Sequence, residues 1–317
     1  MHHDEASCGN RGGFITASRA AMHLLARSIV GNRFAKSAIE TALYDAMGRR
    51  KGVSVAELLG GQVHDRLPVL WTLASGDTGR DIIEAEEMVA RKRHNIFKLK
   101  IGKRDIAQDV AHVGKIKAAL GDKASVRVDV NMAWTEVEAR RAIAMLVDVG
   151  CDLVEQPIAG SNLEGMARLR NQAAIPIMAD EGLTGPNSAL QHIASHACDV
   201  FAIKIEQSGG LRAAQHVQAI AEAAGVAVYG GTMLEAGVST IASAHVFATF
   251  PRLDYGTELF GPLLLTQEIL RQPLDYSDFA LTVPTGPGLG IDLDDDAVTS
   301  LRRDRSKTFS VSQSARA

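Results

Sequence analysis

The sequence has few of the residues that would place it in several common protein classes. Its 317 residues include three cysteines, at positions 8, 151 and 198, which are too few and too far apart for a disulfide framework or a C-x-x-C metal pair. We therefore expect reduced cysteines, with Cys151 and Cys198 near buried elements. Lysine and arginine (34) do not outnumber aspartate and glutamate (37), so no basic field favours a nucleic-acid partner.

Long apolar segments are also missing. No apolar run approaches the roughly 20 residues that span a bilayer, and the N-terminus has no hydrophobic signal-peptide core. These features predict a cytoplasmic protein with no membrane partner. The first 13 residues and the last dozen are expected to be poorly ordered. Between them, a composition of 46% hydrophobic and 22% charged residues is typical of a globular chain with a large core.

Hydrophobic spacing predicts two regions of different structure. From Ile15 to Gly48 the spacing is helical, with a break at Gly31-Asn32 and a helix end near Gly48, and a short helix follows at Ser54–Leu59. After Pro68, apolar strand patterns alternate with helical ones. The expected strands are 69–74, 96–101, 125–130, 153–155, 175–179, 200–205, 226–229 and 254–258. The expected helices are 81–94, 107–120, 135–149, 163–171, 188–195, 211–224 and 236–249.

Eight strands separated by seven helices predict a parallel sheet covered by helices. We interpret it as an α/β fold, a (β/α)₇β TIM-like barrel. The alternative is a doubly wound open sheet, although no Gly-x-Gly-x-x-Gly follows a strand. The expected units are a partial N-terminal capping domain (1–66), the barrel (67–262) and a C-terminal segment (263–317) that returns across the barrel mouth or onto the N-terminal helices.

Five consecutive expected strands each end in an ionisable residue. These residues are separated by 29, 26, 25 and 24 positions, about one strand-helix unit each, and they are Lys100, Asp129, Glu155, Asp180 and Lys204. The carboxyl ends of barrel strands meet at one rim, where enzymes of this fold build their active sites. The pattern therefore predicts that these five side chains face one another.

Three carboxylates at one rim would repel each other unless a cation lay between them. Asp129, Glu155 and Asp180 are hard oxygen ligands, which suit Mn²⁺ or Mg²⁺. Such an ion stabilises the enolate that forms when a base removes the proton next to a carboxylate. Lys98 and Lys100 share one face of their strand, and such a pair indicates a lysine with a lowered pKa that moves protons; the alternative is a solvent-facing edge strand.

The chain resembles the enolase superfamily in its muconate-lactonising subgroup. The resemblance rests on Lys-x-Lys followed by Asp, Glu, Asp and Lys on successive strands. It extends from about Phe34 to Arg303, and the segments most similar to bacterial muconate and chloromuconate cycloisomerases are Phe34–Ser37, Trp71–Asp77, Ile96–Gly102, Ser125–Asn131, Gly230–Glu235 and Thr257–Leu265.

The resemblance implies a role for each site residue. Asp129, Glu155 and Asp180 would bind the metal, and Lys100 would donate and accept the proton. Lys98 would hold the substrate carboxylate and lower the proton affinity of Lys100. Lys204 would lie on the opposite face of the substrate, Glu258 would be a barrel-mouth acid, and Asn131 and Glu181 would be polar neighbours of the metal.

The implied reaction converts a small dicarboxylate, cis,cis-muconate or a chloromuconate, to the muconolactone. This reaction belongs to the catabolism of aromatic compounds. The resemblance also implies that the protein is a homo-oligomer. Alternatives are dipeptide epimerisation, o-succinylbenzoate synthesis, or a truncated, inactive barrel that acts only as an assembly subunit. Family members begin with a three-stranded sheet and a loop that covers the substrate, and this chain is expected to start after them. Gly209-Gly210 is expected to be a plain turn into a helix; the alternative is an anion site.

Overall fold

The structure is a computed structural model that describes residues 13–303. Cys8 and the two ends that were expected to be poorly ordered therefore lie outside the described residues, apart from Gly13. Cys151 and Cys198 are free and buried, as expected. Within residues 13–303, every helix is too short or too polar to cross a membrane.

In the described part of the chain, three helices precede the barrel: α1 (Gly13–Ser28), α2 (Arg33–Lys51) and α3 (Val55–Leu58). The predicted break between the first two is confirmed, with Asn32 in a left-handed conformation. The predicted end at Gly48 is wrong, because α2 continues to Lys51 and Gly52 caps it with φ +70°. Glycine at position 48 instead allows the backbone at Gly288 to approach α2 closely, because a Cβ on residue 48 would lie 2.6 Å from the Cα of Gly288.

The barrel contains seven parallel strands that pair in the order of the chain. They are β2 (Trp71–Leu73), β3 (Ile96–Lys100), β4 (Ser125–Asp129), β5 (Val154–Glu155), β6 (Ile177–Ala179), β7 (Val200–Ile203) and β8 (Ala227–Gly230). This sequential order excludes the doubly wound alternative, in which the strand order reverses at a switch point. The TIM-like fold is confirmed.

The expected eighth strand at 254–258 is reduced to isolated bridges at one residue. Thr257 pairs in parallel with Val69 on one side and with Gly230 on the other. The Leu70 amide donates to the Thr257 carbonyl at 2.9 Å, and the Glu258 amide donates to the Gly230 carbonyl at 2.8 Å. Gly256, at φ +68°, turns the chain and prevents a longer strand, but these contacts still close the ring.

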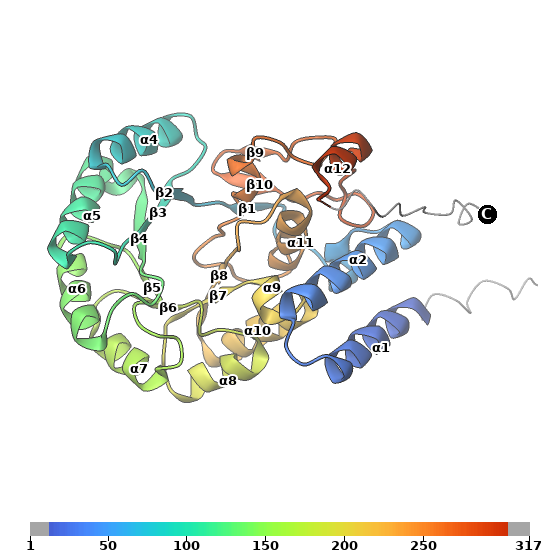
Figure 1. Ribbon diagram of the computed structural model, residues 1–317, viewed down its shortest axis with the longest axis horizontal. Coiled ribbons are helices and arrows are strands. Elements are labelled where there is room, and N and C mark those ends of the chain that lie inside the picture. Colours follow the sequence, from blue (N-terminus) through green and yellow to red (C-terminus); the bar gives the residue numbers. More distant parts are fainter. Residues whose placement is uncertain (1–12, 304–317) are drawn as a thin grey trace, which may run out of the picture.

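Helices cover the outside of the strands (Figure 1). They are α4 (Thr78–Ala90), α5 (Ile106–Leu120), α6 (Glu136–Asp148), α7 (Leu163–Gln172), α8 (Pro186–Ala194), α10 (Leu211–Ala224) and α11 (Gly237–Phe247). The helix predicted from Thr135 is confirmed, with Thr135 and Glu138 forming a capping box. Sequence reasoning missed the single-turn α9 (Ile205–Ser208) and the 3₁₀ turn η1 (Gly121–Lys123).

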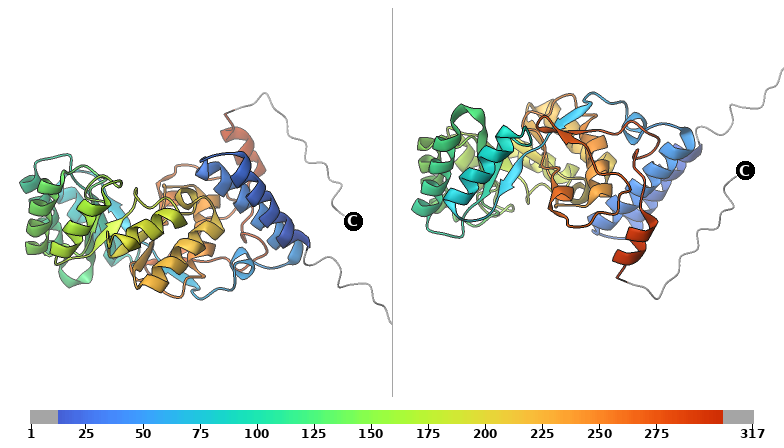
Figure 2. Two further views of the ribbon diagram at one scale, coloured as in Figure 1. Left: turned by 90° about the horizontal axis from the view of Figure 1, so that it is seen from below. Right: turned by 90° about the horizontal axis from the view of Figure 1, so that it is seen from above.

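The C-terminal segment returns onto the N-terminal helices, one of the two expected paths. It contains η2 (Gly261–Leu264), β9 (Tyr276–Ser277), β10 (Ala280–Thr282) and α12 (Asp295–Leu301), and β10 pairs with β1 (Arg66–Pro68). Figures 1 and 2 show α12 at the end of the molecule where α1 and α2 lie, whereas β9 and β10 lie beside β1. The division into units 1–66, 67–262 and 263–317 stays a proposal. Strand β1 lies at the boundary between the first two units, and it pairs with β10, which belongs to the third.

Glycine at position 210 leaves room for the side chain of Glu40, from α2, to contact the start of α10. The Glu40 Oε2 atom accepts from the Arg212 amide at 3.3 Å, so a carboxylate of the chain itself lies at this helix N-terminus. Gly210 has φ +137°, and a Cβ there would lie 2.1 Å from the same oxygen. Gly209-Gly210 is therefore a turn into the helix, as expected, and the anion that it receives is Glu40.

We expect Gly210→Ala to destabilise the protein more than Gly225→Ala. Gly225 lies in the left-handed helical region, which costs alanine about 1–2 kcal/mol, and a Cβ there meets nothing within 4 Å. Gly210, with φ +137° and ψ 176°, lies in a region that is essentially restricted to glycine, at a cost of about 1–3 kcal/mol. The clash at Gly210 adds about 1–3 kcal/mol. Urea unfolding of both variants measures the difference, and equal midpoints would contradict the role of the Glu40 contact.

Candidate active site

The site residues predicted from the sequence meet at the carboxyl end of the strands. A cavity of about 450 Å³ opens there and is lined by Lys98, Lys100, Asp129, Asn131, Asp180, Glu181, Lys204 and Glu258, among others. Glu155 lies beneath it, fully buried. The structure therefore brings together all nine predicted residues, which come from five neighbouring strands, the turns that follow them and the closing segment.

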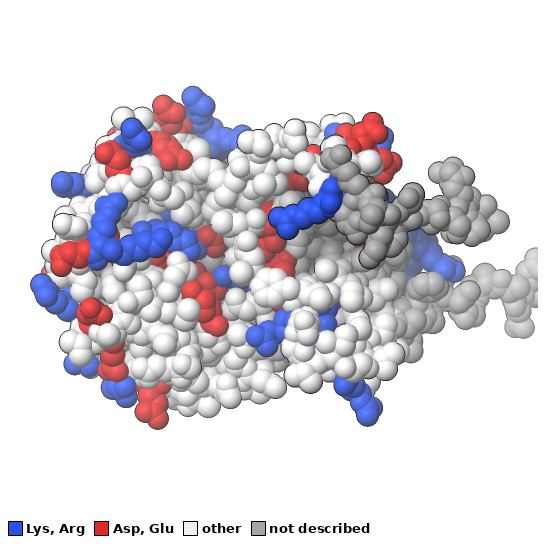
Figure 3. Space-filling view, viewed as in Figure 1, with Lys and Arg blue, Asp and Glu red and all other residues white. Residues whose placement is uncertain are grey.

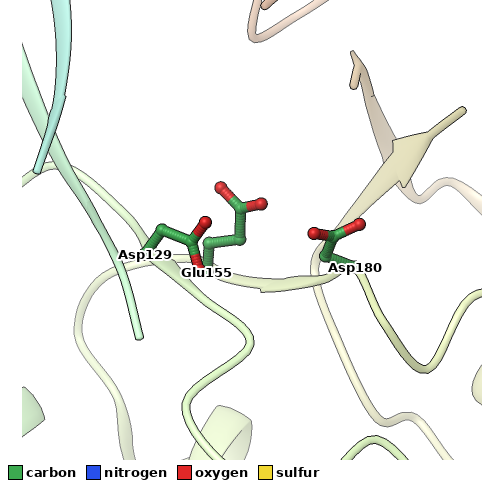
Figure 4. A group of neighbouring side chains, drawn as sticks. All are labelled: Asp129, Glu155 and Asp180. Atoms are coloured by element: carbon green, nitrogen blue, oxygen red, sulfur yellow. The ribbon is translucent and has the colours of Figure 1, made fainter. Parts of the chain in front are cut away.

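The three carboxylates form the centre of the group. Asp129 and Glu155 end β4 and β5, and Asp180 directly follows β6, so neighbouring strands carry them to the same height. One oxygen from each lies within 4.8 Å of the others, and all three residues are buried. Figure 4 shows the carboxylates directed into one space.

Lys98 is the buried counter-ion of this group. Its Nζ lies 2.6 Å from Glu258, 3.2 Å from Glu155 and 3.5 Å from Asp129, and the side chain is 2% exposed. Burial by itself would lower the pKa of Lys98, but the charges of Glu155 and Glu258 outweigh it and hold that pKa well above its ordinary value. Lys98 therefore carries a permanent charge between the acids.

Lys100 occupies the open side of the group. Its Nζ lies 2.6 Å from Asp129 Oδ2 and 3.0 Å from Asn131 Oδ1, and 46% of its side chain is exposed. The Asn131 amide group also donates to Glu181 at 3.0 Å, so it orients a second carboxylate beside the first. Both lysines line the cavity, and Lys100 is much the more exposed of the two. The edge-strand alternative is excluded, because β3 pairs on both sides.

Lys204 approaches the acids from the other side. Its Nζ lies 2.6 Å from one oxygen of Asp180 and 2.7 Å from the other. Burial would lower the pKa of Lys204, but the charge of Asp180 leaves it above the ordinary value. Lys100 and Lys204 therefore flank the carboxylates from opposite sides of the cavity.

The three acids fit a divalent cation. Within the described residues, Glu155 Oε1 is buried and has no hydrogen-bond partner, although a buried carboxylate oxygen normally has one. Burial and then the charge of Asp129 raise the pKa of Glu155 well above its ordinary value, which is the cost of placing these acids together. A cation bound by all three would remove both penalties, and oxygen-only ligands suit Mg²⁺ or Mn²⁺.

Sequence reasoning missed two glutamines that hold this arrangement. The Gln156 side-chain oxygen accepts from the Asp180 amide at 2.9 Å and from the Gly182 amide at 3.3 Å. Gln207 donates to the Asp180 carbonyl at 2.5 Å. Strand alternation gave no signal for Gln156, because its φ of +35° turns it out of the strand pattern.

Apolar residues complete the cavity wall. Phe260, Leu264, Ala74, Met233 and Leu234 line it. Figure 3 shows acidic and basic side chains interspersed on the described part of one face, which agrees with the balanced composition. A pocket with a charged floor and an apolar wall suits a small acid with a hydrocarbon skeleton.

Family comparisons agree with this geometry. The family "Mandelate racemase / muconate lactonizing enzyme, N-terminal domain" matches residues 15–60, and "Enolase C-terminal domain-like" matches residues 81–297. The chain belongs to the enolase superfamily, in this family. A muconate cycloisomerase from Acinetobacter lwoffii is 58% identical over 289 residues, which cover 91% of the chain and 76% of the relative.

Other members of the family are also similar. A chloromuconate cycloisomerase from Cupriavidus necator is 46% identical over 283 residues, covering 89% of the chain and 76% of the relative. The crystal structure of muconate cycloisomerase from Pseudomonas fluorescens superposes with a TM-score of 0.90 at 55% identity, covering 90% of this chain and 80% of that one. A structure of muconate lactonizing enzyme from Pseudomonas fluorescens with muconolactone gives 0.89 at 55% identity, with coverages of 90% and 77%.

We expect Gln156→Met to lower the free energy of unfolding by about 2–4 kcal/mol, because the buried Asp180 amide and the part-buried Gly182 amide lose their acceptor. Gln172→Met is the control: this glutamine is exposed at the end of α7, and its change should stay within about 0.5 kcal/mol. Urea unfolding measures both. A Gln156→Met variant as stable as the control would show that Gln156 does not hold the Asp180 turn.

Proposed function

We propose that the chain is a metal-dependent cycloisomerase that converts cis,cis-muconate, or a chloromuconate, to the muconolactone. The observation that carries this proposal is the buried group of three carboxylates with a lysine on each side, in a family whose similar members include one crystallised with muconolactone. The higher identity to muconate cycloisomerases (58%) than to a chloromuconate cycloisomerase (46%) favours muconate itself.

Asp129, Glu155 and Asp180 would hold Mn²⁺ or Mg²⁺ through their carboxylate oxygens. When bound, the ion would supply the positive charge that stabilises an enolate at the substrate carboxylate. Asn131 and Glu181 keep this site in shape: Asn131 donates to Asp129 and to Glu181 through one amide group. We propose these two as positioning residues rather than metal ligands.

Lys100 moves the proton in this mechanism. In the lactone-forming direction, one substrate carboxylate oxygen adds to the conjugated double bond, and Lys100 delivers its Nζ proton to the carbon next to the other carboxylate. In reverse, the Lys100 amine removes that proton, the carbon–oxygen bond breaks, and the ring oxygen leaves as a carboxylate. The exposed position of Lys100 and its contact with Asp129 and Asn131 support this role.

Lys98, Lys204 and Glu258 provide the electrostatic surroundings. Lys98 would help hold the substrate carboxylate and influence Lys100, with which it shares Asp129 Oδ2. Lys204 would act on the opposite face as electrostatic support. Glu258 balances the charge of Lys98 at 2.6 Å and faces the cavity, where it would meet the substrate.

We further propose that the protein is cytoplasmic and forms a homo-oligomer.

The reaction class can be tested with a substrate panel. Loss of the diene absorbance of cis,cis-muconate supports the cycloisomerase, whereas solvent deuterium exchange at an amino-acid α-position would indicate a dipeptide epimerase. Formation of o-succinylbenzoate would identify the third activity. A chain that binds neither Mn²⁺ nor Mg²⁺ by calorimetry would contradict every enzyme function proposed here and leave an assembly role.

We expect Lys100→Ala to lower kcat by about 10²–10⁴-fold, because it removes the general acid–base group, while the affinity for Mn²⁺ stays nearly unchanged. Lys103→Ala, an exposed lysine in the loop after β3, is the matched control. Muconate turnover and calorimetric Mn²⁺ binding measure the two effects. Turnover by Lys100→Ala at the rate of the control would remove Lys100 from the mechanism.

Mn²⁺ should stabilise the wild-type protein but not Asp180→Asn. A ligand present at about 100 times its Kd stabilises the folded state by about 2.7 kcal/mol, which thermal unfolding detects as a rise in Tm. Asp180→Asn removes one carboxylate from the group and should lose both this rise and turnover. Equal rises in Tm for the two proteins would place the cation elsewhere.

A further inference from the structure

A tyrosine outside the barrel reaches the turn that lines the cavity. Tyr276 belongs to β9, which lies in the three-stranded sheet beside the ring of barrel strands (Figure 1). Its hydroxyl donates to the Leu259 carbonyl at 2.6 Å, and both residues are buried. The C-terminal segment therefore contacts the chain directly between two residues that line the cavity, Glu258 and Phe260.

One peptide group is held at both ends by this contact. The Leu259 carbonyl and the Phe260 amide belong to the same planar peptide unit. The amide donates to the Glu258 carbonyl at 2.8 Å, and the carbonyl accepts from the Tyr276 hydroxyl. Because the unit is planar, these two hydrogen bonds fix its orientation. They thereby fix the direction in which the Phe260 side chain leaves the turn.

Phe260 depends on this orientation for its place in the cavity wall. It is buried beneath the surface of the cavity that it lines. Its ring packs against Trp71, with 5.1 Å between the ring centroids, and the Trp71 indole donates to Glu84 at 2.8 Å. A fixed tryptophan therefore supports the Phe260 ring, whereas Tyr276 holds the backbone that carries it.

Glu258 is anchored by other contacts. Its amide donates to the Gly230 carbonyl at 2.8 Å, and its side chain pairs with Lys98 at 2.6 Å. Both contacts are made by atoms that precede the Leu259–Phe260 peptide in the chain. Loss of the Tyr276 hydrogen bond would consequently move Phe260 more than Glu258 and leave the charged floor of the cavity in place.

The Tyr276 hydroxyl is suited to act as a permanent donor. Burial raises the pKa of Tyr276 above its ordinary value of 10.0, so the hydroxyl keeps its proton at neutral pH. The backbone of this residue is also held, because Tyr276 faces Leu281 of β10 and its carbonyl accepts from Arg93 at 3.3 Å. A donor on a fixed strand gives the Leu259 carbonyl one defined position.

We propose that Tyr276 is a positioning residue for the substrate cavity: its hydroxyl fixes the Leu259–Phe260 peptide, so that the C-terminal segment sets the place of the Phe260 wall and with it the affinity for substrate. The inference rests on the proposed function for the identity of the substrate, but not for the contact itself. The part of the substrate that meets Phe260 is the apolar skeleton of a small acid.

Hydrogen–deuterium exchange of Tyr276→Phe tests the contact without relying on turnover. The change removes one oxygen atom and keeps the ring. Protection of the segment 258–265 should fall about tenfold, because a buried carbonyl loses its donor. Tyr255→Phe is the matched control: it removes the hydroxyl of a half-buried tyrosine near the same turn, keeps its ring over Arg127, and should exchange as the wild type does. Protection of 125–129 in β4 should stay unchanged in both variants.

The kinetic arm uses cis,cis-muconate as the substrate. KM should rise about tenfold in Tyr276→Phe, as expected when one apolar contact in a pocket is lost. Its kcat should stay within about twofold of the wild type, and its calorimetric affinity for Mn²⁺ should be unchanged, because Lys100 and the three carboxylates keep their places. Tyr255→Phe should keep the wild-type KM. A merely structural role for Tyr276 would leave KM unchanged at a temperature at which both variants are folded.

Several outcomes would overturn the inference. They are equal protection of 258–265 in Tyr276→Phe and Tyr255→Phe, an unchanged KM in Tyr276→Phe, and a loss of protection that extends to 125–129, which would indicate a global role. If the wild-type protein does not consume muconate, the proposed function fails, and exchange alone decides whether Tyr276 holds the turn.

Discussion

The structure depends on the balance of charge in a small buried space at the carboxyl end of the barrel. Asp129, Glu155 and Asp180 are each nearly inaccessible to solvent, and a buried carboxylate without a partner is strongly destabilising. Lys98 and Lys204 offset part of this cost from inside the barrel, and Lys100 does so from its open side. The group is stable only while all the strands hold their places around it.

Barrel register is what makes this balance possible. Lys100 lies directly opposite Asp129 across β3 and β4, and Asp129 lies directly opposite Glu155 across β4 and β5. The register of the strands therefore places these charged side chains next to one another. A slip of one residue in any of these strands would direct an acid or a lysine into the apolar layer between strands and helices. Electrostatics and hydrophobic packing therefore specify the same register.

Strained backbone gathers around the same end of the barrel. Asn131, Gln156 and Leu234 follow β4, β5 and β8 with positive φ, which non-glycine residues seldom adopt. Each of these turns aims a functional group: Asn131 at Lys100, Gln156 at the Asp180 amide, and Leu234 at the cavity. Such strain persists where the surrounding contacts overdetermine the conformation.

Periodic features were predictable from the sequence alone. Strand-helix alternation and the regular spacing of Lys100, Asp129, Glu155, Asp180 and Lys204 were sufficient to predict the barrel and the meeting of these side chains, because alternation and repeat length are local properties of the chain. The same reasoning placed an eighth strand at 254–258 and a helix end at Gly48, since neither Gly256 nor Gly48 reveals in sequence which distant backbone it approaches. Gln156 and Gln207 had no local signal. Their roles arise from contacts between turns that are brought together only when the ring of strands closes.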